Sequence, residues 1–233
     1  MGKQNEKTEN LLLLDVVPLS LGVEMQGGVF SVVVPRNTPI PTIKKKVFTT
    51  TQDGQTTVEF PIYEGERPMC KDNNLLGRFE LTGIPPAPRE TPELEVTFDL
   101  DANGILHVTA EDRATHRKND ITIKNDSARL SSSDISRMLA DAEKFKEEDR
   151  KNRERAAARD ALKHYVYQIQ DQLNDPQVLL KYHGDVDALT EALAEALVFA
   201  ESDESADKAE IQAKQKALEK KVGPSFGRVY KQK

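Results

Sequence analysis

The sequence predicts an α+β protein in two parts, an antiparallel β-sandwich followed by an α-helical bundle. Up to about residue 130, short stretches with an apolar residue at every second position alternate with turns rich in Gly, Pro, Asn and Asp. This is the pattern of half-buried strands. Beyond that point apolar residues recur at helical spacing. The change of period at one place in the chain favours two consecutive modules.

The clearest strand of the first part is Leu94–Leu100, in which apolar and polar residues alternate throughout. The turn Asn103-Gly104 leads from it to a second strand, Leu106–Ala110, so the two form a hairpin. The Pro-rich stretch Gly83–Pro92 is predicted to be a loop. The other expected strands are Leu19–Met25, Val29–Val34, Val47–Thr51, Thr57–Tyr63, Arg78–Leu81 and Asp120–Lys124.

The second part begins at Ser131, which with Asp134 resembles a capping box. Between the first two apolar stripes, residues 146–160 are almost entirely polar or alanine. A helix with so little apolar surface is not buried all round, so we expect it to span solvent or to lie against another domain. The four expected helices carry their apolar stripes on Ile135–Phe145, Leu162–Leu173, Leu189–Ala200 and Ile211–Val222.

Composition excludes several classes of protein. Of 233 residues 31% are charged and the net charge is −6, which argues against a general phosphate-binding surface. The run Leu11–Leu14 stops at Asp15 and is too short for a signal-peptide core or a membrane span. No other stretch approaches about 18 apolar residues, so we expect a soluble protein. A single cysteine, Cys70, excludes an internal disulfide framework.

Candidate catalytic and metal-binding motifs are weak. Asp99–Gly104 resembles the first half of a calcium loop, but the twelfth position of that loop is Ala110, with Glu111 one residue late. The flanking segments are strands, so a tight hairpin turn is the better interpretation. The four histidines lack metal-ligand spacing. Ser20 and Ser31 lack the context of a nucleophile elbow. The residues alone therefore point to no catalyst.

One group of side chains has two interpretations. Its members lie on adjacent predicted strands near turns, and from the pattern alone they are most simply the core of the sandwich. The alternative is that part of the group lines a binding surface. The residues are Val23, Met25, Phe48, Thr49, Thr51, Val58 and Phe60.

Long contiguous segments carry a family resemblance: "LLLLDVVPLSLG", "GGVFSVVVPRNTPIPT", "IYEGERPMCKDNNLLGRFELTGIPPAPR" and "EVTFDLDANGILHVTAED". They closely resemble the substrate-binding region of the 70-kDa heat-shock chaperones, from Leu11 to about Tyr230. The resemblance implies a linker within residues 1–14, a peptide-gripping β-sandwich over residues 15–127 and a helical lid over residues 128–233. It also implies that ATP and magnesium bind to an ATPase domain outside this chain, so we expect no cofactor, no metal and no enzymatic activity here.

The resemblance further assigns a peptide site. Its central pocket, which selects a Leu-like side chain, is implied at Val58, with walls from Val23, Phe48, Phe60 and Leu94. Backbone groups near Met25, Thr49 and Thr51, with the side chain of Gln55, are implied to hold the peptide main chain. An arch over the peptide matches Gln26 and Thr51. Gln26 is polar where the family has a small or apolar residue, so this arch is expected to meet the peptide by a hydrogen bond more than by packing.

The lid latch departs from the family pattern. In relatives a carboxylate in the second lid helix pairs with an arginine that matches Arg89, but the matching lid position here is Lys163. Asp160, one helical turn earlier, is expected to replace it. Glu90 stands where the family has glycine and is expected to pair with Lys163, which would reverse the polarity of the contact.

A second latch contact is expected between Asp53 and Tyr167. An exposed ion pair contributes at most about 1 kcal/mol, so a weak latch is compatible with closure. We therefore expect a lid that opens more readily than in relatives.

The four leucines near the start of the chain match the interdomain linker of the family, which is exposed in one nucleotide state and docked on the ATPase domain in the other. The linker residues implied here are Leu11, Leu12, Leu13 and Leu14. Asp15, Arg36, Asn37 and Pro41 are implied to lie near the communicating face. The implied partners are unfolded polypeptides, the ATPase domain, and J-domain and nucleotide-exchange co-chaperones, but neither nucleic acid nor membrane.

Two other functions remain open from the sequence. One is a helical-bundle adaptor with a purely structural sandwich, and the other is a calcium-dependent or hydrolytic module. The compartment also remains open between the cytoplasm and the lumen of the endoplasmic reticulum.

Overall fold

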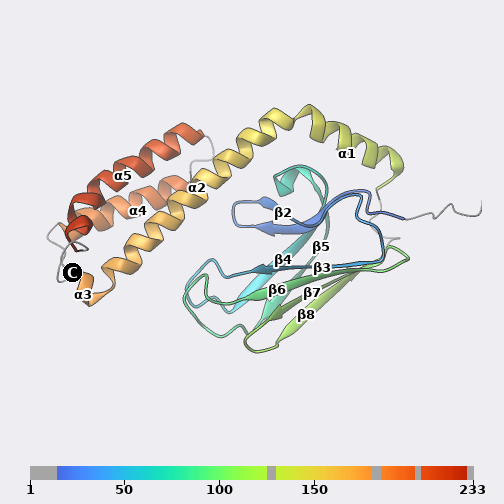
Figure 1. Ribbon diagram of the computed structural model, residues 1–233, viewed down its shortest axis with the longest axis horizontal. Helices are drawn as coiled ribbons and strands as arrows, with labels where there is room; N and C mark the ends of the chain where they lie inside the picture. Colours follow the sequence, from blue (N-terminus) through green and yellow to red (C-terminus); the bar gives the residue numbers. More distant parts are fainter. Residues whose placement is uncertain (1–14, 125–129, 180–184, 203–205, 230–233) are drawn as a thin grey trace, which may run out of the picture. The chain divides into compact units, whose positions relative to one another are not determined.

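A computed structural model describes residues 15–124, 130–179, 185–202 and 206–229. The chain divides into two compact units, Met1–Lys146 and Glu147–Lys233. The first unit contains two antiparallel four-stranded sheets, and helices make up the described part of the second (Figure 1). The predicted α+β fold class is therefore confirmed, while the predicted limits of linker, sandwich and lid stay predictions.

The two sheets have the strand orders β2-β1-β4-β5 and β3-β6-β7-β8. A short 3-10 helix, η1, spans Cys70–Asp72. The strands of the first sheet are β1 (Leu21–Met25), β2 (Val29–Val34), β4 (Thr57–Glu64) and β5 (Asn74–Thr82). Those of the second are β3 (Thr42–Phe48), β6 (Leu94–Leu100), β7 (Leu106–Asp112) and β8 (Lys118–Ile123).

The hairpin of β6 and β7 forms as the sequence predicts. Apolar residues of β6 are buried at every second position, and Phe98 lies opposite Val108 in the ladder. In the turn, Asp101 Oδ1 accepts hydrogen bonds from the backbone N–H groups of Asn103 and Ile105, both at 2.8 Å. These bonds lower the pKa of the Asp101 carboxyl. The carboxylate therefore organises a tight turn, as predicted, and the calcium-loop alternative is not needed.

Strand β3 corrects one prediction. The sequence pattern placed a strand at Val47–Thr51, whereas β3 runs from Thr42 to Phe48. The run Lys44–Lys46 breaks the alternation of apolar and polar residues. Within the described residues β3 is the edge strand of its sheet and pairs with β6 alone. Lysines are common on edge strands, where charge opposes pairing with another chain. Lys46 Nζ donates to Ser31 Oγ at 2.8 Å.

Helix α1 (Ser132–Lys144) belongs to the first unit, and its predicted capping box is confirmed. The Asp134 N–H donates to Ser131 Oγ, and the Ser131 N–H donates to Asp134 Oδ2, each at 3.1 Å. The remaining helices are α2 (Lys146–Leu173), α3 (Pro176–Leu179), α4 (Val186–Ser202) and α5 (Lys208–Val229).

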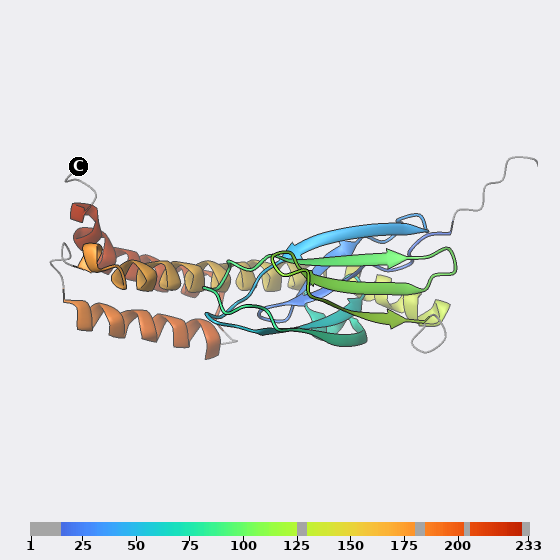
Figure 2. The same cartoon turned by 90° about the horizontal axis from the view of Figure 1, so that it is seen from below.

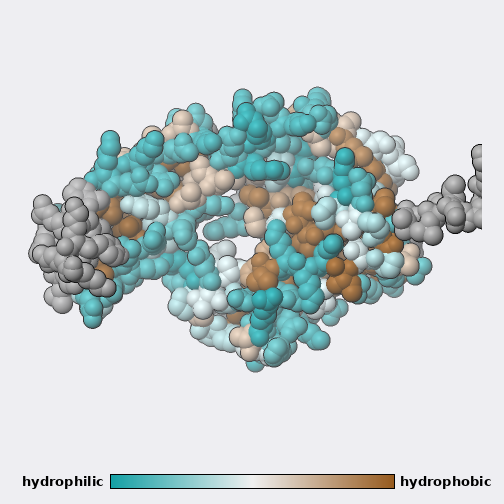
Figure 3. All heavy atoms as spheres, in the orientation of Figure 1, coloured by the Kyte–Doolittle hydropathy of each residue, from teal (hydrophilic) through white to brown (hydrophobic). Residues whose placement is uncertain are grey.

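Helices α2, α4 and α5 run side by side around an apolar core (Figures 1 and 2). Leu162 of α2, Leu193 of α4 and Ile211 of α5 are fully buried there. The predicted polar stretch forms the first half of α2, whose surface is mostly hydrophilic in Figure 3. Glu154 in this half accepts hydrogen bonds from Arg150 and from Lys208 of α5. Across the described chain, no helix combines the length and apolar character that crossing a bilayer requires.

Candidate functional site

The residues predicted to form the pocket belong to one apolar cluster of the sandwich. Val23 on β1, Phe60 on β4 and Leu94 on β6 are buried, with at most 3% of their surface exposed. Val58 on β4 and Phe48 at the end of β3 pack against this cluster but are only partly buried. Strands from both sheets thus bring the predicted residues together in one cluster, on which Val58 and Phe48 remain partly exposed.

The ring of Phe48 is supported by two further aromatic residues. The Phe48 and Phe60 rings meet edge to face, with centroids 6.3 Å apart, and Phe60 stacks on Phe79 at 5.6 Å. Phe79 lies directly opposite Phe60 in the ladder of β4 and β5. Phe79 was not among the residues predicted for the site, although it occupies an inward position of a predicted strand. Aromatic pairs of this geometry contribute about 0.5–1.5 kcal/mol beyond the area they bury.

The two segments predicted to hold a peptide backbone are accessible. Met25 ends β1 with 40% of its surface exposed, and Gln26 begins the turn to β2. Thr49 and Thr51 are exposed in the loop that follows β3. Both segments are therefore exposed at the level of whole residues, although the Met25 carbonyl already accepts from the Gly28 N–H at 3.1 Å. Thr50, between the two threonines, is buried.

Gln55 organises the loop between β3 and β4. Its Oε1 accepts hydrogen bonds from the backbone N–H groups of Thr51 at 3.0 Å and Gln52 at 3.3 Å. Its Nε2 donates to the Thr57 carbonyl oxygen at 2.9 Å. The side chain predicted to contact a peptide thus binds the backbone of its own loop, and its contact with a peptide stays a prediction.

Two of the predicted latch residues pair with each other inside the sandwich unit. Asp53 Oδ1 accepts from the Arg89 N–H and Asp53 Oδ2 accepts from Arg89 Nη1, both at 2.8 Å. The Gly54 N–H donates to the Ala87 carbonyl, and the Glu90 N–H donates to the Thr50 carbonyl. These bonds join the loop after β3 to the Pro-rich loop. The expected contact of Asp53 with Tyr167 stays a prediction.

The other predicted latch residues lie on α2. Asp160, Lys163 and Tyr167 are spaced by three and four residues, so they share one face of the helix. The buried stripe of α2 contains Leu162 and Val166, which point into the helical core. Pairing of the α2 residues with Arg89 or Glu90 stays a prediction.

The residues predicted for a communicating face form one edge of the sandwich. Asp15, Arg36, Asn37 and Pro41 are all exposed. The Ile40 N–H donates to the Asp15 carbonyl at 2.9 Å, which holds the start of the described chain beside the segment after β2.

The predicted linker lies outside the residues that the structure describes, which begin at Asp15. Its assignment as an interdomain linker therefore stays a prediction. The residues concerned are Leu11, Leu12, Leu13 and Leu14.

In the described part of the chain, no group of three His, Cys, Asp or Glu side chains is arranged to hold a metal ion. The Cys70 thiol is 2% exposed. Burial, and to a smaller extent the charge of Glu24, raises its pKa to about 12, so the reactive thiolate is scarce near neutral pH.

Comparison with known proteins covers almost the whole chain. A family model described as Hsp70 protein matches residues 2–231. The chain is similar to heat shock cognate 70 kDa protein 3 of Dictyostelium discoideum, with 47% identity over 230 residues. The match covers 98% of this chain and 36% of that protein, so the chain spans about a third of the length of its relative.

Proposed function

Because the chain belongs to the Hsp70 family, we propose that it binds extended apolar segments of unfolded polypeptides, as the substrate-binding part of a longer chaperone. The observation that carries the proposal is the state of Val58 and Phe48. Both remain partly exposed on an otherwise buried apolar cluster, and the exposed residues Met25 and Thr49 lie at the end of β1 and directly after β3. This arrangement suits a peptide that inserts one apolar side chain and is held by its main chain.

Elementary energetics supports this mode of binding. An extended segment offers unpaired N–H and C=O groups on its edges, and each backbone hydrogen bond contributes about 0.5–1.5 kcal/mol. Burial of one Leu-like side chain contributes roughly 1.5–3 kcal/mol. After the cost of ordering the peptide, several bonds and one pocket give about −8 kcal/mol, or micromolar affinity. Binding through the main chain depends little on the sequence of the peptide and is readily reversed, as a chaperone requires.

The pocket is tested by titrating a fluorescent leucine-centred peptide and following its anisotropy. Val58→Phe fills the accessible position and is expected to weaken binding about tenfold or more, because the guest side chain loses its pocket. Val32→Phe is the matched control, since Val32 is also a strand valine of this sandwich, with 39% of its surface exposed. Equal loss of affinity in both variants, or none in either, would contradict the proposed pocket.

We further propose that the helical unit gates peptide release through the face of α2 that carries Asp160, Lys163 and Tyr167. Arg89 is already engaged by Asp53, and Lys163 places a positive charge on that face. Lys163→Glu is therefore expected to slow release of the peptide, as measured by competition after mixing with excess unlabelled peptide. Lys151→Glu makes the same charge change at an exposed position of α2 and controls for net charge. Equal release rates for the native chain and Lys163→Glu would rule out this latch.

The wider role is also a proposal. We propose that the longer protein binds ATP and magnesium outside this chain and couples nucleotide state to peptide release, with J-domain and nucleotide-exchange proteins as partners. This chain would then bind and release peptide without catalysing a reaction. Addition of ATP and magnesium is expected to leave the peptide affinity of the isolated chain unchanged, and a shift in affinity would contradict this division of labour.

A further inference from the structure

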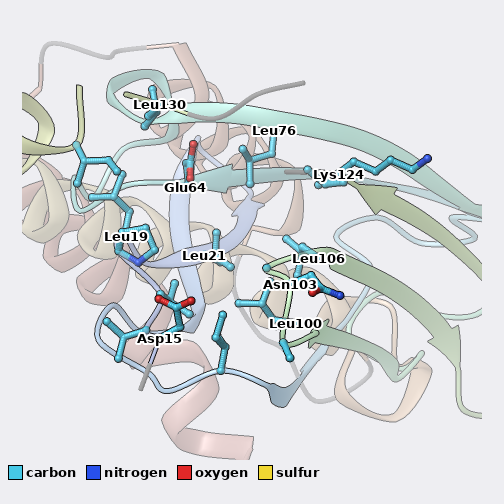
Figure 4. Close-up of a pocket in the computed structure, with 18 of the residues that line it drawn as sticks. Asp15, Leu19, Leu21, Glu64, Leu76, Leu100, Asn103, Leu106, Lys124 and Leu130 are labelled. Carbon is cyan, nitrogen blue, oxygen red and sulfur yellow. The ribbon is translucent and has the colours of Figure 1, made fainter. Parts of the chain in front are cut away.

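A groove opens at the end of the sandwich where the described chain begins. It has a volume of about 540 Å³ and lies between the two sheets and the start of α1, within the first unit. Figure 4 shows Leu21, Leu76, Leu100 and Leu106 converging on it from different strands. The residues expected to bind peptide take no part in its lining.

The floor of the groove is apolar and incompletely covered. Leu21 and Leu106 are nearly buried, but Leu76 of β5 and Ile135 of α1 are only partly buried. Val16 at the mouth has 41% of its surface exposed. Helix α1 is strongly amphipathic, yet none of its residues is fully buried. An apolar surface of this kind is favourable to cover.

The rim of the groove is polar. The carboxylates of Asp15 and Glu64 and the side chain of Lys124 surround the apolar floor, and Lys124 extends away from it (Figure 4). The groove therefore best fits a short chain segment with apolar side chains, whose flanking residues remain in water.

The chain enters this groove directly after a run of such side chains. Asp15 and Val16 line the groove, and the residues before them are Leu11–Leu14. The Ile40 N–H bonds to the Asp15 carbonyl and the Val17 N–H bonds to the Thr38 carbonyl, both at 2.9 Å, so the point of departure is fixed. Four extended residues reach about 14 Å. The polar residues Asn10 and Asp15 bracket the run.

We propose that Leu11–Leu14 docks into this groove on its own sandwich, so that the leucines have a resting site within the chain. The apolar run matches the apolar floor, and its polar flanks match the rim. Any other surface that takes up these leucines then competes with the groove. The proposal goes beyond peptide binding and does not depend on Val58, because different residues form the two sites.

A single tryptophan reports the docking directly, because the chain contains none. Leu13→Trp introduces the probe, and its emission and its quenching by acrylamide are measured in the full chain. Burial of one leucine-sized side chain favours the docked form about tenfold or more. We therefore expect blue-shifted emission and a quenching constant below that of a solvated indole.

Charges placed in the groove should release the probe. Ala102→Lys lies in the exposed hairpin turn at the rim, and Ile135→Lys lies on the groove side of α1. Each, added to Leu13→Trp, is expected to raise the quenching constant to the solvated value. Ala140→Lys is the matched control on the exposed side of α1 and should leave quenching unchanged. The turn variant keeps the test valid if Ile135→Lys disturbs the helix.

Three results would overturn the proposal. One is a solvated probe in the parent chain, and another is equal quenching in Ala102→Lys, Ala140→Lys and the parent. The third is protection that disappears on dilution or on addition of a leucine-centred peptide, since the probe would then occupy a peptide site. Peptide affinity measured on the same samples keeps the outcome separate from that of the Val58 experiment.

Discussion

The two units of the chain bury different kinds of side chain. Among the described core residues, the sandwich has one alanine in 17, whereas the helical unit has five alanines in 13. An alanine buries little area, so the helical core gains less hydrophobic free energy per residue. The comparison teaches that the unit with the proposed peptide site gains more hydrophobic free energy per core residue than the unit with the proposed gate. We therefore expect the helical unit to unfold more readily than the sandwich.

The lone cysteine allows the two units to be followed separately. Cys70 lies in the sandwich unit, is buried, and has a pKa raised to about 12 by its burial. It therefore reacts with thiol reagents only when the sandwich opens. Helical circular dichroism mostly follows the other unit, because α2, α4 and α5 lie there.

The largest effect is expected from Phe98→Ala in the sandwich core. Phe98 is fully buried on β6, and removal of a buried aromatic ring leaves a cavity that costs about 4 kcal/mol. The rate of Cys70 labelling should rise about a thousandfold, because the open sandwich becomes more populated by that factor. Unchanged labelling would show that Cys70 does not report opening of this core.

The next effect is expected from Leu193→Ala in the helical core. Leu193 of α4 is fully buried among helices α2, α4 and α5, and the substitution costs about 3 kcal/mol. Helical circular dichroism should be lost at a lower temperature, while the rate of Cys70 labelling stays that of the native chain. A parallel rise in labelling would mean that the two units unfold together, which would break the comparison.

Alkaline pH should sharpen the comparison. Burial and a hydrogen bond to Glu24 raise the pKa of Tyr63 in the sandwich to about 12. The stability this provides is complete below pH 10, the ordinary tyrosine pKa, and is lost as pH rises through 12, because the unfolded state ionises first. Tyr63→Phe should flatten the loss of sandwich stability above pH 10 in denaturant titrations. An unaltered pH profile would exclude Tyr63 as its cause.

A smaller effect is expected where the sandwich unit ends, at the cap of α1. Ser131→Ala removes the Oγ that accepts from the Asp134 N–H and donates to Asp134 Oδ2, but keeps the Ser131 N–H that donates to the same carboxylate. The expected cost is about 1 kcal/mol. The loss should appear as faster amide hydrogen exchange in the first turn of α1. Ser132→Ala, in the same turn, controls for loss of a hydroxyl, because Ser133 Oγ itself lies 2.7 Å from Ser131 Oγ. Equal exchange in both variants would contradict the role of the cap.

Features with local causes could be predicted from the sequence, and features that join distant residues could not. The β6–β7 hairpin and the Ser131 cap were predictable because their causes are local: alternation, a turn and two side chains three residues apart. Strand β3 was misplaced because exposure at a sheet edge removes the apolar pattern. The Phe79 contact and the groove of Figure 4 were missed because they join residues far apart in the chain. The predicted pocket residues do meet, but their assignment came from a family resemblance and not from their pattern.

The smallest expected effect concerns Glu90, in the Pro-rich loop between β5 and β6 of the sandwich unit. Its backbone φ is +63°, a left-handed conformation that disfavours residues with a Cβ by about 1–2 kcal/mol. Glycine avoids this cost, but it has more conformational freedom in the unfolded chain, which lowers the stability of the folded state by roughly 0.5–1 kcal/mol. We therefore expect Glu90→Gly to stabilise the sandwich by about 0.5 kcal/mol, as measured by denaturant unfolding.

The control for Glu90→Gly is Glu90→Ala, which removes the carboxylate but keeps the Cβ. If the backbone conformation is the cause, the alanine variant gains nothing and only glycine raises the unfolding midpoint. If both variants gain equally, the cause is the loss of the Glu90 carboxylate and not the backbone conformation. The result also concerns the proposed latch. If Glu90→Gly stabilises the sandwich while Arg89 stays paired with Asp53, then hydrogen bonds position Arg89, and the backbone strain at Glu90 is not required.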